Sequence, residues 1–256
     1  MRVRAGGTCM GKTSLPGVCF DLLSREIPLQ KIMGLDDLER LRLLDGQEGG
    51  GIKLYSGDRI ERVALVDFRL GAGVPIPHHE NRLSIGAEIF QIVPDFSCKL
   101  PLWGINSVIM QDGTYYFDTD FSFGVDLVQE YDLVIKYLEP FDAIYKKFCR
   151  HPDLQVVPLA DMTTWVRTYI SPVFITATTT VERRQAVYDL AAEYIKLWVR
   201  MYRDVQPDPA LKKPQQQRLQ AQYAGMKSTD RMGKVLLKAY GKETFNKFFK
   251  AMASAS

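Results

Sequence analysis

Five β-rich segments follow one another between residues 52 and 125, and only short turns separate them. The segments are rich in Val, Ile, Tyr and Phe, and turn-forming residues stand between them at 56–58, 71–80 and 111–113. Neighbouring parallel strands need a crossover of a dozen or more residues, usually a helix, and these connections leave no room for one. We therefore predict an antiparallel meander, with a hairpin turn at Asp112 and Gly113.

The rest of the chain has mainly helical patterns. Residues 180–203 carry apolar side chains at three- and four-residue spacing behind Thr179-Thr180-Val181-Glu182, which has the form of a capping box. Residues 210–218 are polar and glutamine-rich and are predicted to form a loop. A helix over 229–239 is expected to stop at Gly241, before one last helix. Strands followed by helices indicate an α+β fold, with helices on the faces of one antiparallel sheet.

The segment before the predicted sheet has a weaker pattern. Residues 20–45 predict short helical pieces interrupted at Pro28 and Gly34, and the glycines at 46 and 49–51 predict a flexible connection. We expect a flexible N-terminal segment over 1–19 and a single domain over 20–256.

The stretch GGTCMGKTS at 6–14 satisfies the phosphate-loop pattern, in which glycine amides and a lysine surround a phosphate. That pattern works between a buried parallel strand and a helix. Here the preceding MRVRA is short and alternates with arginines, and Pro16 and Gly17 occupy the first turns of the expected helix. Although Asp67 ends an apolar strand as a magnesium-assisting residue would, nucleotide binding remains the last alternative.

The bulk properties exclude several classes of function. The chain has 256 residues, 46% hydrophobic and 25% charged, with a net charge of +3, so composition gives no nucleic-acid footprint. The four cysteines are scattered and the histidines number only three, which does not favour a metal site built from protein ligands. No apolar run approaches the length that spans a membrane. Reduced thiols are expected, in a bacterial cytoplasm or a plastid stroma.

Acidic and amide residues interrupt the predicted strands at Asp67, Glu88, Asn106, Asp118 and Asp120. A carboxylate among Val, Ile and Phe is costly to bury unless it is paired or functional. Asp118 and Asp120 share one face because side chains alternate along a strand. The alternative is that this face meets solvent.

Two blocks of the sequence resemble the ferredoxin-dependent bilin reductases. Residues 98–106, CKLPLWGIN, are similar to a Leu-Pro-Leu-aromatic-Gly-x-Asp segment of that family. Residues 228–241, STDRMGKVLLKAYG, are similar to its C-terminal Asn-Asp-Lys helix start, and WVRTYISP at 165–172 also fits. The resemblance spans about 51–249 and is most specific in the C-terminal block.

The resemblance implies a three-layer α/β/α sandwich in which the sheet and the C-terminal helices enclose biliverdin or a dihydrobiliverdin. It implies no bound cofactor or metal, electrons delivered singly from a [2Fe-2S] ferredoxin, protons from side chains, and a monomer with neither nucleic-acid binding nor membrane insertion. Asp230 matches the essential C-terminal aspartate, although an aspartate near the start of a predicted helix also suits an N-cap. Asp67 and Glu88 are candidates for a second proton donor. The substrate-contacting residues are expected to be Trp103, Ile89, Thr229 and Arg231, the last as a partner of a propionate.

Asn106 departs from the family pattern, because many members carry the central aspartate at this place. An amide hydrogen-bonds but cannot deliver a proton at neutral pH. Plant phytochromobilin synthases also have Asn here, so reduction of the A-ring diene is the preferred reaction. Ile89 stands where phycocyanobilin-forming members carry a histidine.

Two other functions stay open from the sequence. A relative that binds bilins as a carrier or regulator would not need the missing proton donors. An enzyme like the red chlorophyll catabolite reductases would share the fold and the electron donor but take a bulkier tetrapyrrole.

Overall fold

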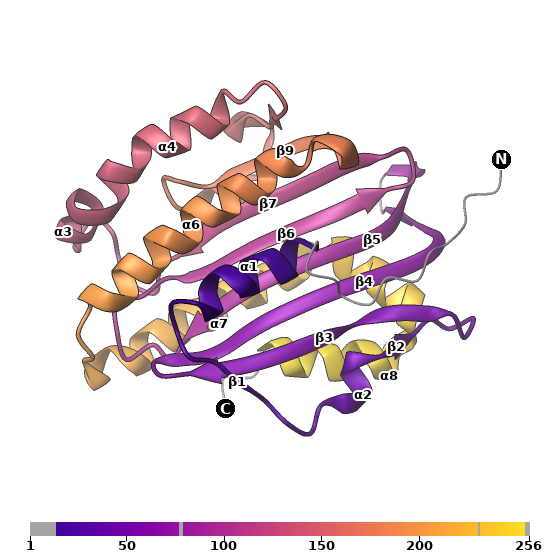
Figure 1. The fold of residues 1–256 in the computed structure, drawn as a ribbon, viewed down its shortest axis with the longest axis horizontal. Coiled ribbons are helices and arrows are strands. Elements are labelled where there is room, and N and C mark those ends of the chain that lie inside the picture. Colours follow the sequence, from indigo (N-terminus) through magenta and orange to yellow (C-terminus); the bar gives the residue numbers. More distant parts are fainter. Residues whose placement is uncertain (1–13, 77–78, 230, 254–256) are drawn as a thin grey trace.

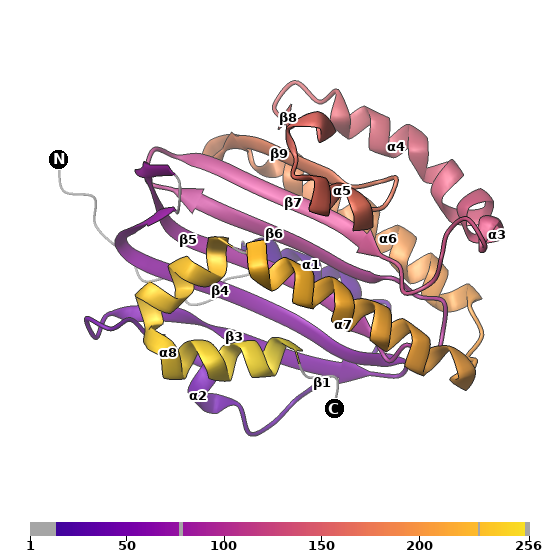
Figure 2. The same cartoon turned by 180° about the vertical axis from the view of Figure 1, so that it is seen from behind.

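A computed structural model describes residues 14–76, 79–229 and 231–253. Its centre is an antiparallel sheet of nine strands in the order β1-β3-β4-β5-β6-β7-β9-β8, with β2 added to β3. Helices cover both faces, so the chain forms the expected three-layer sandwich (Figures 1 and 2). We call the two sides of the sheet the α6 face, which Figure 1 shows, and the α7 face, which Figure 2 shows.

The predicted meander is confirmed. Consecutive strands pair antiparallel in chain order: β3 (Glu48–Gly57), β4 (Ile60–Ile76), β5 (His79–Pro94), β6 (Leu102–Met110) and β7 (Thr114–Ser122). The β6–β7 hairpin turns at 111–113, where the Asp112 carboxylate accepts a hydrogen bond from the Thr114 amide and Gly113 has a φ of 85°. The short strands at the edges are β1 (Gln30–Lys31), β2 (Leu41–Arg42) and β8 (Gln155–Val156).

One strand of six residues was not predicted from the sequence. β9 (Ile175–Thr180) pairs with β7 and extends the sheet. Its run of threonines favours a strand, because branching at Cβ restricts the side chain in a helix. Since β9 includes Thr180, the predicted capping box is wrong, and α6 (Gln185–Asp204) begins only after a 3-10 turn at Val181–Arg183.

The α6 face carries the larger core. α1 (Leu15–Ser24), α4 (Glu139–Cys149) and α6 pack there against strand residues that include Phe90, Trp103 and Phe117. Tyr194 of α6 is fully buried and its ring contacts Trp103, Phe121 and Phe141. The short elements that connect this layer are α3 (Tyr131–Leu133), η1 (Val134–Leu138) and η2 (Leu159–Asp161).

The α7 face is covered by α5 (Thr164–Tyr169), α7 (Lys212–Thr229) and α8 (Arg231–Ala253) (Figure 2). The loop predicted at 210–218 is therefore wrong: a 3-10 turn at Pro209–Leu211 leads directly into α7. Lys, Gln and Arg have good helix propensity, and Gln215 is buried with its amide donating to the Phe96 and Cys98 carbonyls. The predicted break in the last helix is confirmed, because Gly241 has a φ of 77° inside α8.

The glycines at 49–51 do not form a flexible connection. They begin β3, and the Tyr240 hydroxyl from α8 donates to the Gly49 carbonyl. Gly50 has a φ of 90°, and a Cβ there would lie 1.8 Å from the Asp67 carbonyl oxygen on β4. Glycine is needed because two backbones approach closely. The α2 helix (Asp36–Glu39) packs beside them, and Leu38 joins the core under α8.

The expected boundary at residue 19 falls inside α1. Leu15 and Cys19 are fully buried, Ser14 caps the helix, and Pro16 is accepted in its first turn. A helix therefore does follow the phosphate-loop pattern, whose residues up to 13 lie outside the described residues. Among the described strands, however, every pairing is antiparallel, which is not the setting of a phosphate loop.

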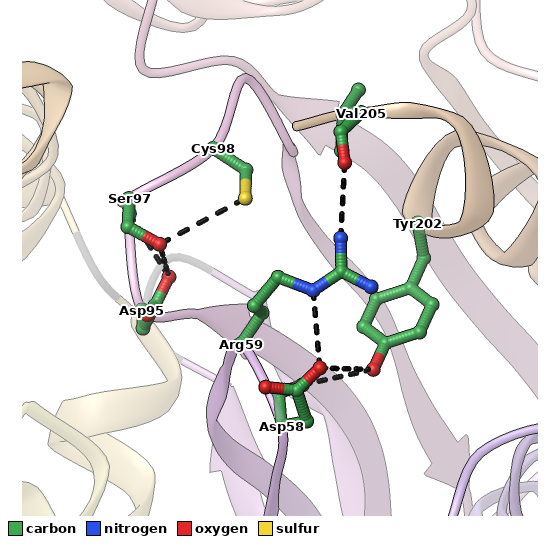
Figure 3. Close-up of polar contacts among 7 residues, drawn as sticks. All are labelled: Asp58, Arg59, Asp95, Ser97, Cys98, Tyr202 and Val205. Atoms are coloured by element: carbon green, nitrogen blue, oxygen red, sulfur yellow. Dashed lines mark hydrogen bonds and ion pairs between the residues drawn. The ribbon is translucent and has the colours of Figure 1, made fainter. Parts of the chain in front are cut away.

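A polar corner joins the β3–β4 turn to the end of α6 (Figure 3). Arg59, with a φ of 52°, donates to Asp58 over 3.2 Å and to the Val205 carbonyl over 3.0 Å. Its guanidinium lies 4.1 Å from the centre of the Tyr202 ring, and the Tyr202 hydroxyl donates to the Asp58 carbonyl. These contacts hold the β3–β4 turn against the end of α6.

Candidate functional site

Side chains of β6 and β7 alternate between the two faces of the sheet. Trp103 and Ile105 point into the core of the α6 face, as do Phe117 and Phe121. The residues between them, Asn106 among them, therefore belong to the α7 face. The pairing of β6 with β7 then decides which polar side chains meet on that face.

Asn106 and Asp118 form a hydrogen-bonded pair on the α7 face. They are directly opposite each other in the β6–β7 ladder, and Asn106 Nδ2 donates to Asp118 Oδ1 over 2.8 Å. Asn106 is exposed and Asp118 is half-buried. Protein atoms still surround the carboxyl group closely enough that burial raises the pKa of Asp118 to about 6, although the hydrogen bond from Asn106 opposes this shift.

Asp120 lies two residues along the same strand and holds the segment after α5. It accepts hydrogen bonds from the Ser171 amide at 3.1 Å, from the Ser171 hydroxyl and from the Phe121 amide at 2.8 Å. Burial raises the pKa of Asp120 to about 7; its hydrogen bonds from Ser171 and Phe121 oppose the shift, and the charge of Asp118 adds to it. Burial, together with both carboxylates, raises the pKa of Tyr169 in α5 to about 12.

Small and apolar residues continue the surface beside this pair. Ile89 of β5 is directly opposite Asn106, so the two side chains share the α7 face. Gly104 is opposite Asp120 and contributes no side chain, and a Cβ added there would meet nothing closer than 3.7 Å. The sheet therefore offers an amide and a carboxyl group next to Ile89 and to Gly104, which lies opposite Gln91, an arrangement suited to a flat ligand with polar centres.

Two of the carboxylates singled out from the sequence lie on the other side of the sheet. Glu88 is opposite Asp67 in the β4–β5 ladder, and both belong to the α6 face. Glu88 is 6% exposed and accepts hydrogen bonds from the Tyr115 hydroxyl at 3.0 Å and from the Leu15 amide, at the start of α1. The structure therefore does not bring Asp67 and Glu88 together with Asn106.

Their surroundings fit a structural role. Asp67 forms an ion pair with Arg69 over 3.4 Å, and its side chain is only 17% exposed. Burial raises the pKa of both Asp67 and Glu88. Trp103 also belongs to the α6 face: it is fully buried, and its Nε1 donates to Thr119 over 3.0 Å. A ligand on the α7 face would not reach this ring.

The comparisons with known proteins identify the family of this chain. Residues 82–252 match the family described as ferredoxin-dependent bilin reductase, which is more than half of the chain. The chain belongs to the ferredoxin-dependent bilin reductases. A crystal structure of phytochromobilin synthase from tomato in complex with biliverdin has the same fold, with a TM-score of 0.77 and 12% sequence identity. The match covers 95% of this chain and 82% of the tomato chain. A search of curated protein sequences found no match.

The C-terminal candidates of this bilin reductase lie at the junction of α7 and α8. Asp230 is outside the described residues, as are the side chains of Thr229 and Arg231. The two helices themselves lie on the α7 face (Figure 2). Gln222 of α7 donates to Ser122 over 3.2 Å, and Ser122 shares its face with Asp118 and Asp120. The family's most specific block therefore approaches the face that carries Asn106.

The sequence alone predicted no role for Asp118, Asp120 or Ser171 in a bilin reductase. The two-residue period did place both aspartates on one face, and the register in the structure confirms it. The available signal for the pair was the turn at 111–113: it puts Met110 opposite Thr114, and counting back along both strands puts Asn106 opposite Asp118. Ser171 belongs to the WVRTYISP block, but its contact with Asp120 spans 51 residues of chain and has no local signal.

The described part of this bilin reductase has two further properties. It contains no helix long and apolar enough to cross a membrane. Nor do three or more His, Cys, Asp or Glu side chains gather within it as a metal site would require.

The raised pKa values predict how stability changes with pH. Between about pH 4 and pH 7 the folded state binds more protons at Asp118 and Asp120 than the unfolded chain does, so stability falls as pH rises through this window. We expect the free energy of unfolding to fall by about 4 kcal/mol from pH 5 to pH 8 in urea titrations, because over this range Asp118 contributes about one pKa unit and Asp120 about two, at ~1.36 kcal/mol for each unit.

Asp67 and Glu88 act in the same direction, because burial raises their pKa values too. Asp118→Asn should therefore make the pH dependence shallower without abolishing it. A variant whose stability has the same slope as the wild type would contradict the assignment of a raised pKa to Asp118.

Proposed function

We propose that this bilin reductase reduces biliverdin or a dihydrobiliverdin at the A-ring diene, giving a phytobilin of the kind that serves as a phytochrome chromophore. Electrons come one at a time from a reduced [2Fe-2S] ferredoxin, through bilin radicals, and side chains supply the protons. No cofactor stays bound to the protein, which acts as a monomer. The bilin lies on the α7 face, between the sheet and the α7–α8 junction.

The observation that carries this proposal is the pair formed by Asn106 and Asp118. Asn106 Nδ2 donates to Asp118 Oδ1 over 2.8 Å, so the amide turns its oxygen away from the carboxyl group. The Asn106 Oδ1 is then available as an acceptor. A linear tetrapyrrole presents pyrrole N–H donors along one edge, which matches an acceptor set in an otherwise open floor.

The remaining parts of the site follow from the family pattern. Asp230 is the principal proton donor in this proposal, because it matches the family's essential aspartate. Thr229 and Arg231 flank it, and the Arg231 guanidinium is suited to pair with a propionate. Ile89 contributes apolar contact beside Asn106, with which it shares the sheet face.

The test is anaerobic incubation with biliverdin, a ferredoxin and a reducing system, followed by chromatography of the bilins. We expect the biliverdin absorbance to decline and a phytobilin reduced at the A-ring to appear. No product from biliverdin or from dihydrobiliverdin would overturn the proposal. A stable coloured complex that ignores the supply of electrons would instead indicate a bilin carrier.

Substitutions at Gly104 test where the bilin lies. Gly104→Leu places a side chain on the open floor, so we expect biliverdin affinity to fall at least ~10-fold, since overfilling a site costs about 1–3 kcal/mol. The measurement is the dissociation constant from an absorbance titration.

The matched control is Gly104→Ala. The added Cβ would lie 3.7 Å from the Phe90 carbonyl oxygen, an ordinary contact, so the fold and the affinity should both persist. Equal affinity of the Leu variant and the wild type would place the bilin elsewhere.

A further inference from the structure

The α7 face carries an acid one strand away from the place where the family's central aspartate is replaced. Asn106 cannot supply a proton at neutral pH. Its hydrogen-bond partner, Asp118, is on the same face and only 12 residues away in the chain. We propose that Asp118 is the sheet's proton donor to the bilin, with Asn106 holding its carboxyl group. This inference rests on the proposed function and deepens it.

The contacts of the two aspartates distinguish Asp118 from Asp120. Asp120 accepts hydrogen bonds from the Ser171 amide and hydroxyl, which fix the Ser171 segment to β7, and from the amide of Phe121. Within the part of the chain that the structure describes, Asn106 is the hydrogen-bond partner found for Asp118. The carboxylate of Asp120 therefore serves to hold the Ser171 segment in place. Asp118 uses Oδ1 for the hydrogen bond from Asn106, so its second oxygen is not needed for the fold.

The surroundings of Asp118 favour its protonated form. Its carboxyl group faces Asn106 from β6, Thr176 from β9, Asp120 on its own strand and Tyr169 from α5. Among these described neighbours none is a cation that would stabilise the carboxylate. Burial raises the pKa of Asp118 to about 6, so part of the population holds a proton near neutral pH, as a general acid requires.

Each two-electron reduction of the bilin consumes two protons and two electrons, and each electron comes from one reduced ferredoxin. After an electron arrives, the bilin becomes more basic, the O–H bond of Asp118 breaks, and its proton forms a new bond to the bilin. Asp118 is left as a carboxylate, which Asn106 Nδ2 stabilises, and water returns the proton between turnovers. The second proton comes from another donor, for which Asp230 is proposed.

Asp118→Asn tests the assignment directly, because it keeps the shape and removes the proton. We expect biliverdin affinity within about threefold of the wild type and single-turnover reduction slowed at least ~100-fold, the lower end of the usual contribution of a general acid. The wild-type rate should decline as pH rises above about 6, and the variant should lose that dependence. The control is Asp142→Asn on α4, whose carboxylate forms a surface ion pair with Lys146.

A swapped pair tests the same inference if Asp118→Asn folds poorly. Combining Asn106→Asp with Asp118→Asn keeps one acid and one amide at opposite positions of the ladder. Turnover within about tenfold of the wild type would support an acid in this pair. The proposal would be overturned if the swapped variant folds and binds the bilin but does not reduce it. It would also be overturned if Asp118→Asn reduces biliverdin at the wild-type rate.

A second readout separates this inference from the proposed function. Protonation of bound biliverdin changes its absorbance, so a pH titration of the complex reports the neighbouring acid without any turnover. We expect Asp118→Asn to shift that titration by at least about one pH unit. If the wild type binds but never reduces biliverdin, the proposed function fails; an unshifted titration in the variant overturns the role of Asp118.

Discussion

Asp230→Asn should abolish measurable turnover of biliverdin while the protein still binds it. Asparagine has the shape of aspartate but no acidic proton, so the rate should fall at least ~100-fold, the usual contribution of a general acid. Affinity should stay within about threefold, because shape and hydrogen bonding are largely kept. Single-turnover absorbance under anaerobic conditions measures the rate, and a titration without ferredoxin measures the affinity.

The comparison with Asp142→Asn keeps this test specific. Asp142 is a partly exposed carboxylate on α4 that pairs with Lys146, so its loss removes the same charge from the other layer of the sandwich. That variant should reduce biliverdin at the wild-type rate. Turnover preserved in Asp230→Asn would show that the match to the family's C-terminal aspartate does not carry its role.

Gly50→Ala should destabilise the protein by at least ~3 kcal/mol, among the largest effects of a single methyl group. The new Cβ would lie 1.8 Å from the Asp67 carbonyl oxygen and 2.8 Å from its carbon, at a φ of 90°. The obstacle is backbone, and β4 cannot retreat because it is paired with β3 and β5. Thermal unfolding should show a Tm about 10 °C lower, at roughly 2–4 °C for each kcal/mol.

Gly46→Ala separates the two causes of this loss. Gly46 has a φ of 84°, similar to that of Gly50, but nothing lies within 4 Å of an added Cβ. It should therefore lose only the ~1–2 kcal/mol of the left-handed conformation. Equal losses at the two positions would mean that the close approach of β3 and β4 costs nothing.

Local patterns sufficed to predict the meander but not the elements that are held by distant contacts. The turn at 111–113 and the alternation in β6 and β7 are local, and they appear as expected. The glycines at 49–51 were predicted to be flexible because the sequence does not reveal their close contacts with α8 and β4. α7 was not predicted because its composition is polar and, among its residues whose burial the structure describes, only Gln215 is buried, with hydrogen-bond partners more than 100 residues away.

The candidate site was predictable only in part for a related reason. In a sheet covered on both faces, apolar residues occupy both sides of a strand, so alternation does not tell which side faces a ligand. Asp67 follows Val66 and precedes Phe68, and both of these belong to the core under α8. The strand ladder was needed to place Asp67 and Glu88 on the α6 face and Ile89 beside Asn106.

The hairpin of β6 and β7 also sets an order of assembly. The bond between Asn106 and Asp118 closes 12 residues of chain, whereas the bond that brings α7 to Ser122 closes 100. The entropic cost of closing a loop grows with the logarithm of its length, so closing the shorter loop costs about 2 kcal/mol less. The polar floor of the site can therefore form from a single hairpin, before the C-terminal helices that will cover it have been synthesised.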